Sequence, residues 1–522
     1  MAPSSAATPP SRGRVVPVVA AVLWLLVATT YLTRPVRELL IRVVPDDALF
    51  YLVIARNGAA GRLSTFDGLT LTNGYHPLWW LVLQAMAFAL HGPGSLERAA
   101  FLFGLLAYAG AAVVLVRALR PVGETAGAVT VAALVLLVLP ASWLLTEAPL
   151  GILLFGLFLA ELVRAGTTGE RRDGRIAVFG AVTVLARLDA VFLVVPALLL
   201  GAWEGLSGTR ADAATAGAGA RPDVVRALMP LFVVGSALVT YMALSVVAFG
   251  HALPISGALK SSFPHLVVPT LGSLTRYLRG LPPLFAALLW LAARATGWRP
   301  PLPRSVDGAL IVMLAGQVAY YAYELLFQKQ MAWGVASWHF ALGNVLLAVM
   351  LGVAATRLST RTALTGAAVL LALAATDLHR KLRPDAPVDT SLAPLAEAGA
   401  WIHDHVDANA VIAATDPGLV AWLGERPTIA LDGLVNSYAY QDVLRDRRLA
   451  EYLDGQGVDY VVTLGLYPTP GRDPTLLSVP SRLYWPDGDR LALAGADSVF
   501  TAAGAGVRIW RYRPQAAASP AP

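Results

Sequence analysis

The stretch VVPVVAAVLWLLVATTYLT, Val15–Thr33, carries no charged side chain and decides the class of fold. At a rise of about 1.5 Å per residue, it is long enough to cross a hydrocarbon core of about 30 Å. Its apolar residues are continuous rather than alternating, which predicts a helix, because only helices and closed barrels satisfy the backbone in lipid. No small-residue cleavage signal precedes Arg34, so we expect an uncleaved first membrane helix rather than a signal peptide.

The composition of the whole chain supports the same class. Of its 522 residues, 56% are hydrophobic and only 14% are charged, whereas soluble proteins carry about 25% charged residues. Cysteine is absent, which excludes disulfides and thiolate metal sites. The net charge of +6 is spread over loops rather than gathered on one basic face, so we do not expect nucleic acid as a partner. The preference for Arg over Lys, with abundant Ala and Gly, is typical of a GC-rich genome and indicates a bacterial membrane.

Further apolar runs follow the first one almost to Asp377. If each run crosses the membrane once, the chain has about eleven spans. The further runs are Pro77–Leu90, Ala99–Val116, Thr125–Pro140, Leu150–Val163, Ile176–Trp203, Ala227–Phe249, Leu281–Ala293, Ala309–Phe327, His339–Ala355 and Ala363–Ala375.

Basic loops in the second half of the chain predict its orientation. Glu204–Arg226, Arg294–Arg304 and Thr356–Arg361 are rich in Arg and should be cytoplasmic, because cytoplasmic loops carry an excess of Lys and Arg. This orientation places the chain after Asp377 outside the cytoplasm.

The first half of the chain fits this rule less well. Eleven single crossings would leave the basic loop Arg164–Arg175 outside, against the positive-inside rule. A break at Arg187-Leu188-Asp189 would divide the long run Ile176–Trp203 into two crossings. The number of crossings would then agree with a cytoplasmic loop at Arg164–Arg175. We therefore expect a polytopic α-helical protein with about 11 to 13 transmembrane helices.

The end of the chain changes character after about Arg380, where charge and proline rise. The short apolar runs VIAATDPG, PTIALDG and VDYVVTLG, with a polar helical stretch between the last two, predict a small α/β domain. RLALAG and VRIWRYR look like two more strands. We predict a membrane core over residues 15–377, an extracytoplasmic α/β domain over 378–515, and disordered tails at 1–14 and 516–522. No internal repeat is visible, which weighs against transporters built from inverted repeats.

The first outer loop, residues 34–76, is too long for a plain connection between neighbouring helices. Within it, Ala48–Ala60 fits a short helix lying along the membrane. Two adjacent acids, Asp46 and Asp47, directly precede this helix. Asp is a favoured residue at a helix start, so capping this helix is one interpretation of the pair.

Several stretches of the chain resemble one family of membrane enzymes. DDALFYLVIARN and TNGYHPLWW in the first loop, LARLDAVFL (Leu185–Leu193), FGHALPISGALKS (Phe249–Ser261) and DPGLVAWLGERPTIALDGLVNS (Asp416–Ser437) occur in one order. Together they resemble bacterial GT-C glycosyltransferases that use polyprenyl-phosphate sugars, and more closely a branch with a DDA start and an NGYHPLW end. The resemblance covers nearly the whole chain.

This resemblance implies transfer of a sugar from a polyprenyl-phosphate donor to an extracytoplasmic glycan, lipid or protein acceptor, with inversion at the anomeric carbon. In such enzymes the base that takes the acceptor proton lies at the start of the acidic pair, which here is Asp46. Asp47 would orient the acceptor, assist a metal or share the role. Some relatives need a divalent cation. Two adjacent acids are too few ligands to indicate a metal site, so the sequence does not decide whether a cation is needed and we assign no cofactor.

The leaving phosphate needs cations and hydrogen-bond donors near the membrane surface. Lys260 in PISGALKSS is the best candidate, because this chain otherwise uses Arg almost everywhere. His76 is the next, and Arg56 on the first-loop helix is a third. Each has an alternative interpretation. Lys260 could simply extend from lipid to water, His76 could be a polar residue at a helix start, and Arg56 could contact lipid headgroups.

Other polar residues near the predicted outer face are weaker candidates. Arg187 and Asp189 interrupt an apolar run, where ionisable groups indicate either function or mutual pairing, and Glu147 is a candidate partner for Arg187. Asn73 and Tyr75 could contact the donor or be turn and interface residues. Asp432 and Asn436 follow a predicted strand, where loops often bind ligands, but turn chemistry explains them equally well.

A second class of function is a polytopic transporter or flippase of a lipid-linked sugar, in which the acids steer the substrate without making a new glycosidic bond. A third is a non-catalytic scaffold of cell-envelope assembly. The sequence motifs favour the transferase, and the sugar, the acceptor and the polyprenol length are not specified by them.

Overall fold

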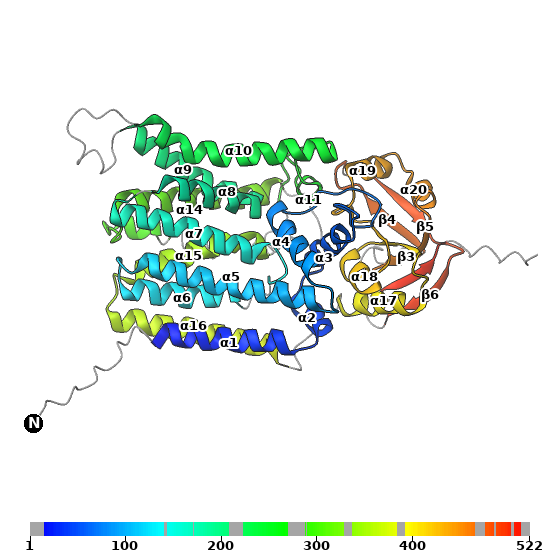
Figure 1. Cartoon of the computed structure of the whole chain (residues 1–522), viewed down its shortest axis with the longest axis horizontal. Coiled ribbons are helices and arrows are strands. Elements are labelled where there is room, and N and C mark those ends of the chain that lie inside the picture. The colour runs from blue at the N-terminus through cyan, green and yellow to red at the C-terminus, as the bar shows by residue number, and fades with distance from the viewer. Residues whose placement is uncertain are drawn as a thin grey trace, which may run out of the picture.

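The computed structural model describes residues 15–139, 143–170, 172–207, 223–269, 288, 290–327, 337–383, 392–464, 475–484, 487–502 and 506–512. Long helices lie side by side in a bundle, and a smaller domain that contains strands lies at one end of it (Figure 1). By length and composition, eight helices in the described part of the chain could each cross a membrane. The chain is therefore a polytopic helical protein with an α/β domain, as the sequence predicts.

The bundle is made of helices whose apolar runs match the predicted spans. They are α1 (Val15–Thr33), α5 (Ser95–Leu119), α6 (Glu124–Val138), α7 (Ala148–Thr168), α8 (Asp173–Ala186), α9 (Val191–Leu206), α10 (Val224–Phe249), α14 (Arg304–Phe327), α15 (Ala341–Ala355) and α16 (Thr360–Leu382). The predicted span Leu281–Ala293 lies mostly outside the described residues, as do both predicted disordered tails.

The long run Ile176–Trp203 is broken at the predicted place. Helix α8 ends at Ala186, Arg187 is extended with φ −145° and ψ 110°, and a short 3-10 helix, η3 (Leu188–Ala190), leads into α9. The run is therefore two helices that meet at the end of the bundle where the α/β domain lies (Figure 1). This break puts the loop Arg164–Arg175 at the opposite end, where an ion pair of 2.7 Å joins Asp173 to Arg226.

One predicted span does not cross the bundle. Helix α4 (Pro77–Ala89) starts beside η3, because His76 accepts a hydrogen bond from the Leu188 N–H. After α4 the chain reaches Gly94, where an added Cβ would lie 3.1 Å from the Val36 side chain of α2 (Val36–Val43), which follows α1. Both ends of α4 therefore lie on the side of the α/β domain, so the expectation that Pro77–Leu90 spans the membrane is wrong.

The α/β domain contains a five-stranded sheet with the order β2-β1-β3-β7-β6. Strands β1 and β2 and strands β1 and β3 are parallel, whereas β7 is antiparallel to β3 and β6. The strands of this sheet are β1 (Val411–Ala414), β2 (Thr428–Ala430), β3 (Val458–Thr463), β6 (Asp497–Thr501) and β7 (Arg508–Arg511).

A separate hairpin and four helices complete the domain. The hairpin pairs β4 (Leu476–Pro480) with β5 (Gly488–Ala492), and the helices are α17 (Leu392–His405), α18 (Pro417–Gly424), α19 (Tyr438–Arg445) and α20 (Leu449–Gly455). The two strands β4 and β6 were not predicted. Strand β1 (VIAA) is apolar throughout and mostly buried, and in β3 (VDYVVT) Val458, Tyr460, Val461 and Val462 are buried.

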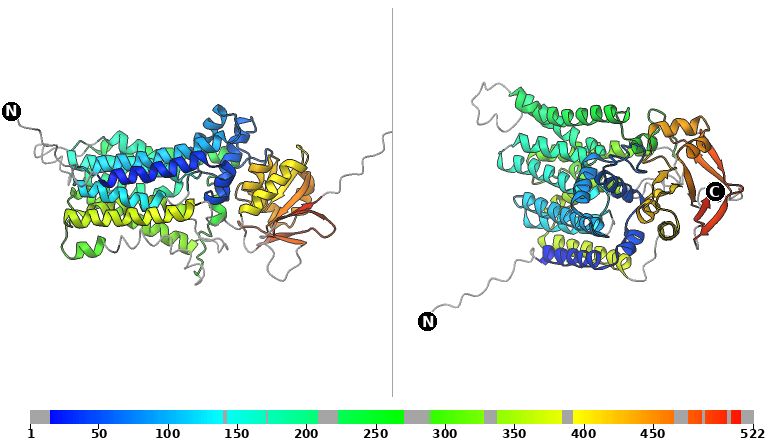
Figure 2. Two further views of the ribbon diagram at one scale, coloured as in Figure 1. Left: turned by 90° about the horizontal axis from the view of Figure 1, so that it is seen from below. Right: turned by 45° about the vertical axis from the view of Figure 1, so that its right-hand side comes forward.

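The first loop joins the domain to the bundle. It forms the helices α2 and α3 (Asp46–Ala59), and α3 packs against α18 (Figures 1 and 2). Arg56 of α3 donates to the carbonyls of Ala421 and Trp422 and stacks on the Trp422 ring at 4.6 Å. The Trp422 indole in turn donates to Glu97 of α5 over 3.0 Å. These contacts fix the domain at the end of the bundle.

Close helix packing gives a testable prediction. A Cβ on Gly316 of α14 would lie 1.7 Å from the Phe192 carbonyl oxygen of α9, so the two backbones could not keep their distance. We expect Gly316→Ala to lower the free energy of unfolding by about 1–3 kcal/mol, measured as a lower thermal midpoint in detergent. Gly366→Ala is the control, because nothing lies within 4 Å of its added Cβ. Equal midpoints for the two variants would contradict the packing described here.

Candidate active site

The two adjacent acids at the start of α3 point to different sides of the helix. Helix α3 follows Pro45, which has extended backbone angles and makes no side-chain cap. Successive residues of a helix are about 100° apart, so Asp46 and Asp47 cannot face the same surroundings. Neither acid caps α3 itself, and the structure gives each a different partner.

Asp46 faces the α/β domain. Its carboxylate accepts the backbone N–H of Gly418 at 2.9 Å and that of Leu419 at 2.8 Å, both in the first turn of α18. It therefore caps the amino end of α18, where unpaired N–H groups and the helix dipole favour a negative charge. The contact requires glycine at 418, because a Cβ there would lie 2.6 Å from the Asp46 Oδ2 atom.

Asp46 belongs to a group of acids at this junction. Burial raises the pKa of Asp46 to about 7, opposed by its two backbone hydrogen bonds. Burial, together with the nearby charge of Asp46, raises the pKa of Asp416 to about 8, and burial raises the pKa of Asp432 to about 6 against the effect of Arg482. The junction between loop and domain therefore holds protons that ordinary aspartates would lose.

Asp47 faces a cavity at the end of the bundle. The Asp47 Oδ2 atom lies 3.5 Å from the Lys260 Nζ atom of α11 (Ile255–Lys260). The cavity has a volume of about 70 Å³ and is bounded by α3, the α6–α7 connection, α11, η6 (Ser337–Phe340) and the α/β domain. Its lining residues are Asp47, Ala48, Phe50, Tyr51, Gly74, His76, Thr146, Glu147, Ser256, Lys260, Trp338, His339 and Leu434.

His76 lines the same cavity and presents a hydrogen-bond donor. Its Nδ1 atom accepts the Leu188 N–H at 3.2 Å, so in the neutral ring the proton is on Nε2. Burial lowers the pKa of His76 below its ordinary value, which favours that neutral ring. The Nε2 atom lies 3.8 Å from Glu147, at the cavity wall.

Arg187 lies behind the cavity rather than in it. Only 1% of the residue is exposed. Its guanidinium donates to Glu147 at 2.8 Å, to both carboxylate oxygens of Asp189 at 3.1 and 2.6 Å, and to the Trp338 carbonyl at 2.8 Å. The predicted pairing with Glu147 and Asp189 is therefore present in the structure, and Arg187 has no direct access to a substrate.

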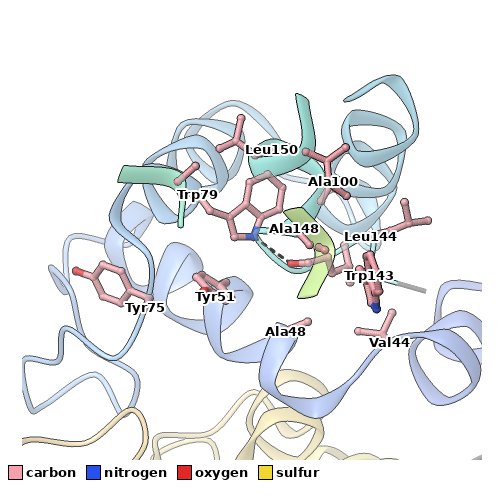
Figure 3. Packing of buried hydrophobic residues seen from close by; sticks show 14 of the residues in the cluster. Val44, Ala48, Tyr51, Tyr75, Trp79, Ala100, Trp143, Leu144, Ala148 and Leu150 are labelled. Atoms are coloured by element: carbon pink, nitrogen blue, oxygen red, sulfur yellow. Dashed lines mark hydrogen bonds between the residues drawn. The ribbon is translucent and has the colours of Figure 1, made fainter. Parts of the chain in front are cut away.

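The wall beside this cluster is aromatic. The Tyr51 hydroxyl donates to Glu147 at 3.0 Å and accepts the His76 N–H at 3.3 Å. Behind it, Trp79 is fully buried and donates to the Leu145 carbonyl at 3.0 Å; Figure 3 shows this ring among Tyr51, Ala148 and neighbouring apolar residues. The predicted cavity residues are thus held by a packed hydrophobic layer.

The remaining predicted site residues of the first loop have structural partners. Tyr75 shares a hydrogen bond of 2.6 Å with Ser64. The Asn73 side chain donates to Ser245 and Leu253 and accepts the Ile255 N–H, which fixes α11 beside the loop. Arg56 faces α18, as described above. None of these three side chains lines the cavity with Asp47.

In the domain, Asp432 and Asn436 shape the loop that covers the cavity. Asp432 accepts the Leu434 N–H at 3.0 Å, and Asn436 donates to the Ala430 carbonyl at 3.2 Å. The loop lies so close to the first loop that a Cβ on Gly74 would lie 2.1 Å from the Leu434 carbonyl oxygen. These two residues therefore place Leu434 at the cavity and do not line it themselves.

Sequence reasoning missed several residues of this region. Arg482, Ser256, Thr146 and Leu434 were not singled out, although Ser256 and Leu434 lie within quoted motifs, because nothing in their residue type or spacing indicates a site and they approach it only in the fold. Within the described ranges, no group of three or more His, Asp or Glu side chains could hold a metal ion.

The raised pKa values of Asp46, Asp416 and Asp432 predict that the stability of the protein depends on pH. The pKa of Asp416 is about 8 in the folded protein and near 4 in the unfolded chain. Between these values the folded state keeps a proton that the unfolded state has lost, so stability falls as the pH rises from about 4 to about 8. We expect Asp416→Asn to flatten this fall and to raise the thermal midpoint at pH 8.

Asp404→Asn serves as the control for that measurement, because Asp404 is exposed on α17 of the same domain. The measurement compares how the thermal midpoint changes from pH 5 to pH 8 in the two variants and in the unchanged protein. If Asp416→Asn and Asp404→Asn keep the same slope, the proton is not held at this junction.

The Arg187 cluster predicts a large loss of stability on removing the guanidinium. Arg187→Met would leave Glu147 and Asp189 buried without their cation, which costs about 3–5 kcal/mol. Arg380→Met is the matched control, since Arg380 is 69% exposed in its pair with Asp377, and such pairs contribute about 0–1 kcal/mol. Chemical unfolding in detergent should separate the two variants clearly. Similar losses in both would show that the cluster is not a buried ion network.

Comparisons with known proteins agree with this architecture. A domain family described as a domain of unknown function (DUF8728) matches residues 383–508. The comparison with curated proteins gives no match. The fold is similar to that of ArnT from Cupriavidus metallidurans, both in the crystal structure bound to undecaprenyl phosphate and in the apo state.

The similarity to ArnT extends over the whole molecule. For the complex with undecaprenyl phosphate the TM-score is 0.59 at 14% identity, covering 95% of this chain and 98% of ArnT. For the apo structure the TM-score is 0.54 at 14% identity, covering 95% and 97% of the two chains. At this identity the likeness concerns the fold alone, and the chain has an ArnT-like fold over nearly its whole length.

Proposed function

We propose that this chain is an inverting glycosyltransferase that moves a sugar from a polyprenyl-phosphate donor to an acceptor at the membrane face carrying the α/β domain. The observation that carries the proposal is the cavity in which Asp47, Lys260 and His76 meet. They come from three separate segments, and together they supply a base, a cation and a neutral donor. The ArnT-like fold supports the donor class, because ArnT has been crystallised with undecaprenyl phosphate.

In this mechanism Asp47 accepts the proton of the acceptor hydroxyl. The acceptor oxygen forms a bond to the anomeric carbon while the bond from that carbon to the phosphate oxygen breaks, and the phosphate leaves with the electron pair. A single displacement of this kind needs one base and inverts the anomeric carbon. We assign the base to Asp47 rather than Asp46, because Asp46 turns away from the cavity and already accepts two backbone N–H groups.

Lys260 and His76 would receive the leaving phosphate. The Lys260 ammonium lies beside Asp47, and its flexible side chain can turn towards a phosphate that enters the cavity. The His76 Nε2–H adds a donor that carries no charge. Such groups stabilise the negative charge that develops as the carrier lipid departs.

The buried cluster around Arg187 keeps the walls of the site in place. One guanidinium fixes the start of α7 through Glu147, the α8–α9 break through Asp189 and η6 through the Trp338 carbonyl. The site can therefore keep its shape while a donor lipid exchanges, which fits a role for Arg187 in positioning rather than in contact with substrate.

The distribution of charge supports an extracytoplasmic site in the cell membrane of a bacterium. The basic loops Arg164–Arg175 and Thr356–Arg361 lie at the end of the bundle opposite the α/β domain (Figure 1). Since basic loops stay in the cytoplasm, the domain and the cavity would face outwards. Acceptors there include glycans, lipids and proteins of the cell envelope.

The test is transfer by the purified, full-length protein with a panel of polyprenyl-phosphate hexoses and pentoses. We expect release of polyprenyl phosphate and a new glycosidic bond of inverted configuration. Asp47→Asn should lower the rate by about 10²–10⁴-fold while donor binding persists, because the general base is lost but the phosphate partners remain.

Asp46→Asn is the matched control, one residue away on the other face of α3. It should weaken domain attachment and thermal stability more than it lowers the rate, since Asp46 caps α18. A fully active Asp47→Asn protein would refute the assignment of the base. Movement of the lipid-linked sugar across liposomes without any new glycosidic bond would instead favour a flippase.

A further inference from the structure

A second cavity lies on the side of the bundle formed by α1, α5 and α6. Its volume is about 390 Å³, the largest of the cavities described here. It lies along the helices, and its lining is almost entirely small or apolar, including Ala20, Ala21, Ala112, Val135 and Ile152. We call it the α1–α5 groove. Its shape and chemistry suit a hydrocarbon chain.

One polar group inside the groove has no partner. The Tyr108 side chain of α5 lines the groove and is 7% exposed, and its hydroxyl makes no hydrogen bond with any described residue. An unpaired hydroxyl in an apolar surrounding costs free energy. By contrast, the neighbouring Trp24 indole already donates to the Leu105 carbonyl at 2.9 Å. The Tyr108 hydroxyl is thus an unpaired group buried at the groove wall, and the surface that the groove offers to an occupant at this depth is apolar.

Two arginines mark one end of the groove. Arg117 and Arg120 line it at the last turn of α5, and neither makes an ion pair with an acid in the described part of the chain. This end of α5 is followed by Gly123, where an added Cβ would lie 3.9 Å from Thr356. The arginines therefore lie at the end of the bundle opposite the α/β domain, where guanidinium groups can bind phosphate.

The distance along α5 between Tyr108 and the two arginines suits one phospholipid, with its phosphate at the arginines and its acyl chain at Tyr108. Tyr108 and Arg117 are nine residues apart, or about 14 Å along the helix, so the arginines lie at headgroup depth when Tyr108 lies among the chains. Beside the groove, α1 exposes Val18, Val22 and Leu25 to the surroundings. A lipid can enter from the bilayer without passing the candidate active site.

We propose that the α1–α5 groove binds an anionic glycerophospholipid from the membrane leaflet opposite the α/β domain. Its phosphate lies between Arg117 and Arg120, and one acyl chain fills the groove past Tyr108. The polyprenyl donor is not the occupant, because its phosphate has to reach Lys260 at the other end of the bundle. The exclusion of the polyprenyl donor rests on the proposed function, whereas the lipid site itself rests on the lining of the groove.

The experiment is native mass spectrometry of the full-length protein released from bilayers of phosphatidylglycerol and phosphatidylcholine. We expect the unchanged protein to retain phosphatidylglycerol and Ala21→Trp to lose it, because the indole would fill the groove. Ala21 is exposed, so the larger side chain meets no packed neighbour. Val18→Trp is the matched control, on the same helix, 60% exposed and outside the groove lining.

Two further variants test the polar contacts. Arg117→Gln with Arg120→Gln should lower the preference for phosphatidylglycerol over phosphatidylcholine by roughly tenfold or more, since each basic residue near a membrane surface contributes to anionic lipid binding. Tyr108→Phe should leave the retained lipid unchanged, because an acyl chain offers the hydroxyl no hydrogen-bond acceptor. A marked loss of lipid in this variant would place a polar part of the ligand at Tyr108 and contradict the proposed pose.

The outcomes are decisive in both directions. Loss of lipid in Ala21→Trp but not in Val18→Trp, with reduced headgroup preference in the arginine variant, establishes the site. Equal retention in the two tryptophan variants overturns it. Stronger retention of added polyprenyl phosphate than of phosphatidylglycerol also overturns it, and would assign the groove to the carrier lipid.

Discussion

One buried guanidinium organises the end of the bundle on which the candidate active site is built. Arg187 joins Glu147, Asp189 and the Trp338 carbonyl, and these belong to three segments that are distant in the sequence. A charge buried in this way is tolerated only when its hydrogen bonds are satisfied, so the three segments cannot move apart independently. The helix break at Arg187 is the local cost of bringing this charge to the cavity wall. The cavity-lining residue His76 lies against the same cluster, 3.8 Å from Glu147.

The first-loop helix α3 separates two tasks by its two faces. One face presents Asp47 to the cavity, and the other presents Asp46 and Arg56 to α18. The position of the α/β domain is therefore coupled to the position of the Asp47 carboxylate, because both depend on one helix. Any movement of the domain would shift the cavity wall at Leu434 and the orientation of Asp47 together.

The two ends of the bundle differ in chemistry. The end with the α/β domain collects acids, a lysine and a neutral histidine around a small polar cavity. The opposite end collects arginines, and two of them, Arg117 and Arg120, close an apolar groove. This asymmetry agrees with a protein that handles a lipid phosphate on one membrane face and is anchored by anionic lipid on the other.

The sequence by itself determined the membrane class, most helices, the helix break at Arg187 and the α/β character of the tail, because hydrophobic runs and turn residues act locally. It also predicted that the acid pair lies in the first outer loop. Only the tertiary structure decided that Asp47 rather than Asp46 faces the cavity, that Arg187 lies behind the wall, and that α4 does not cross. These outcomes depend on contacts between segments up to hundreds of residues apart, which no local pattern records.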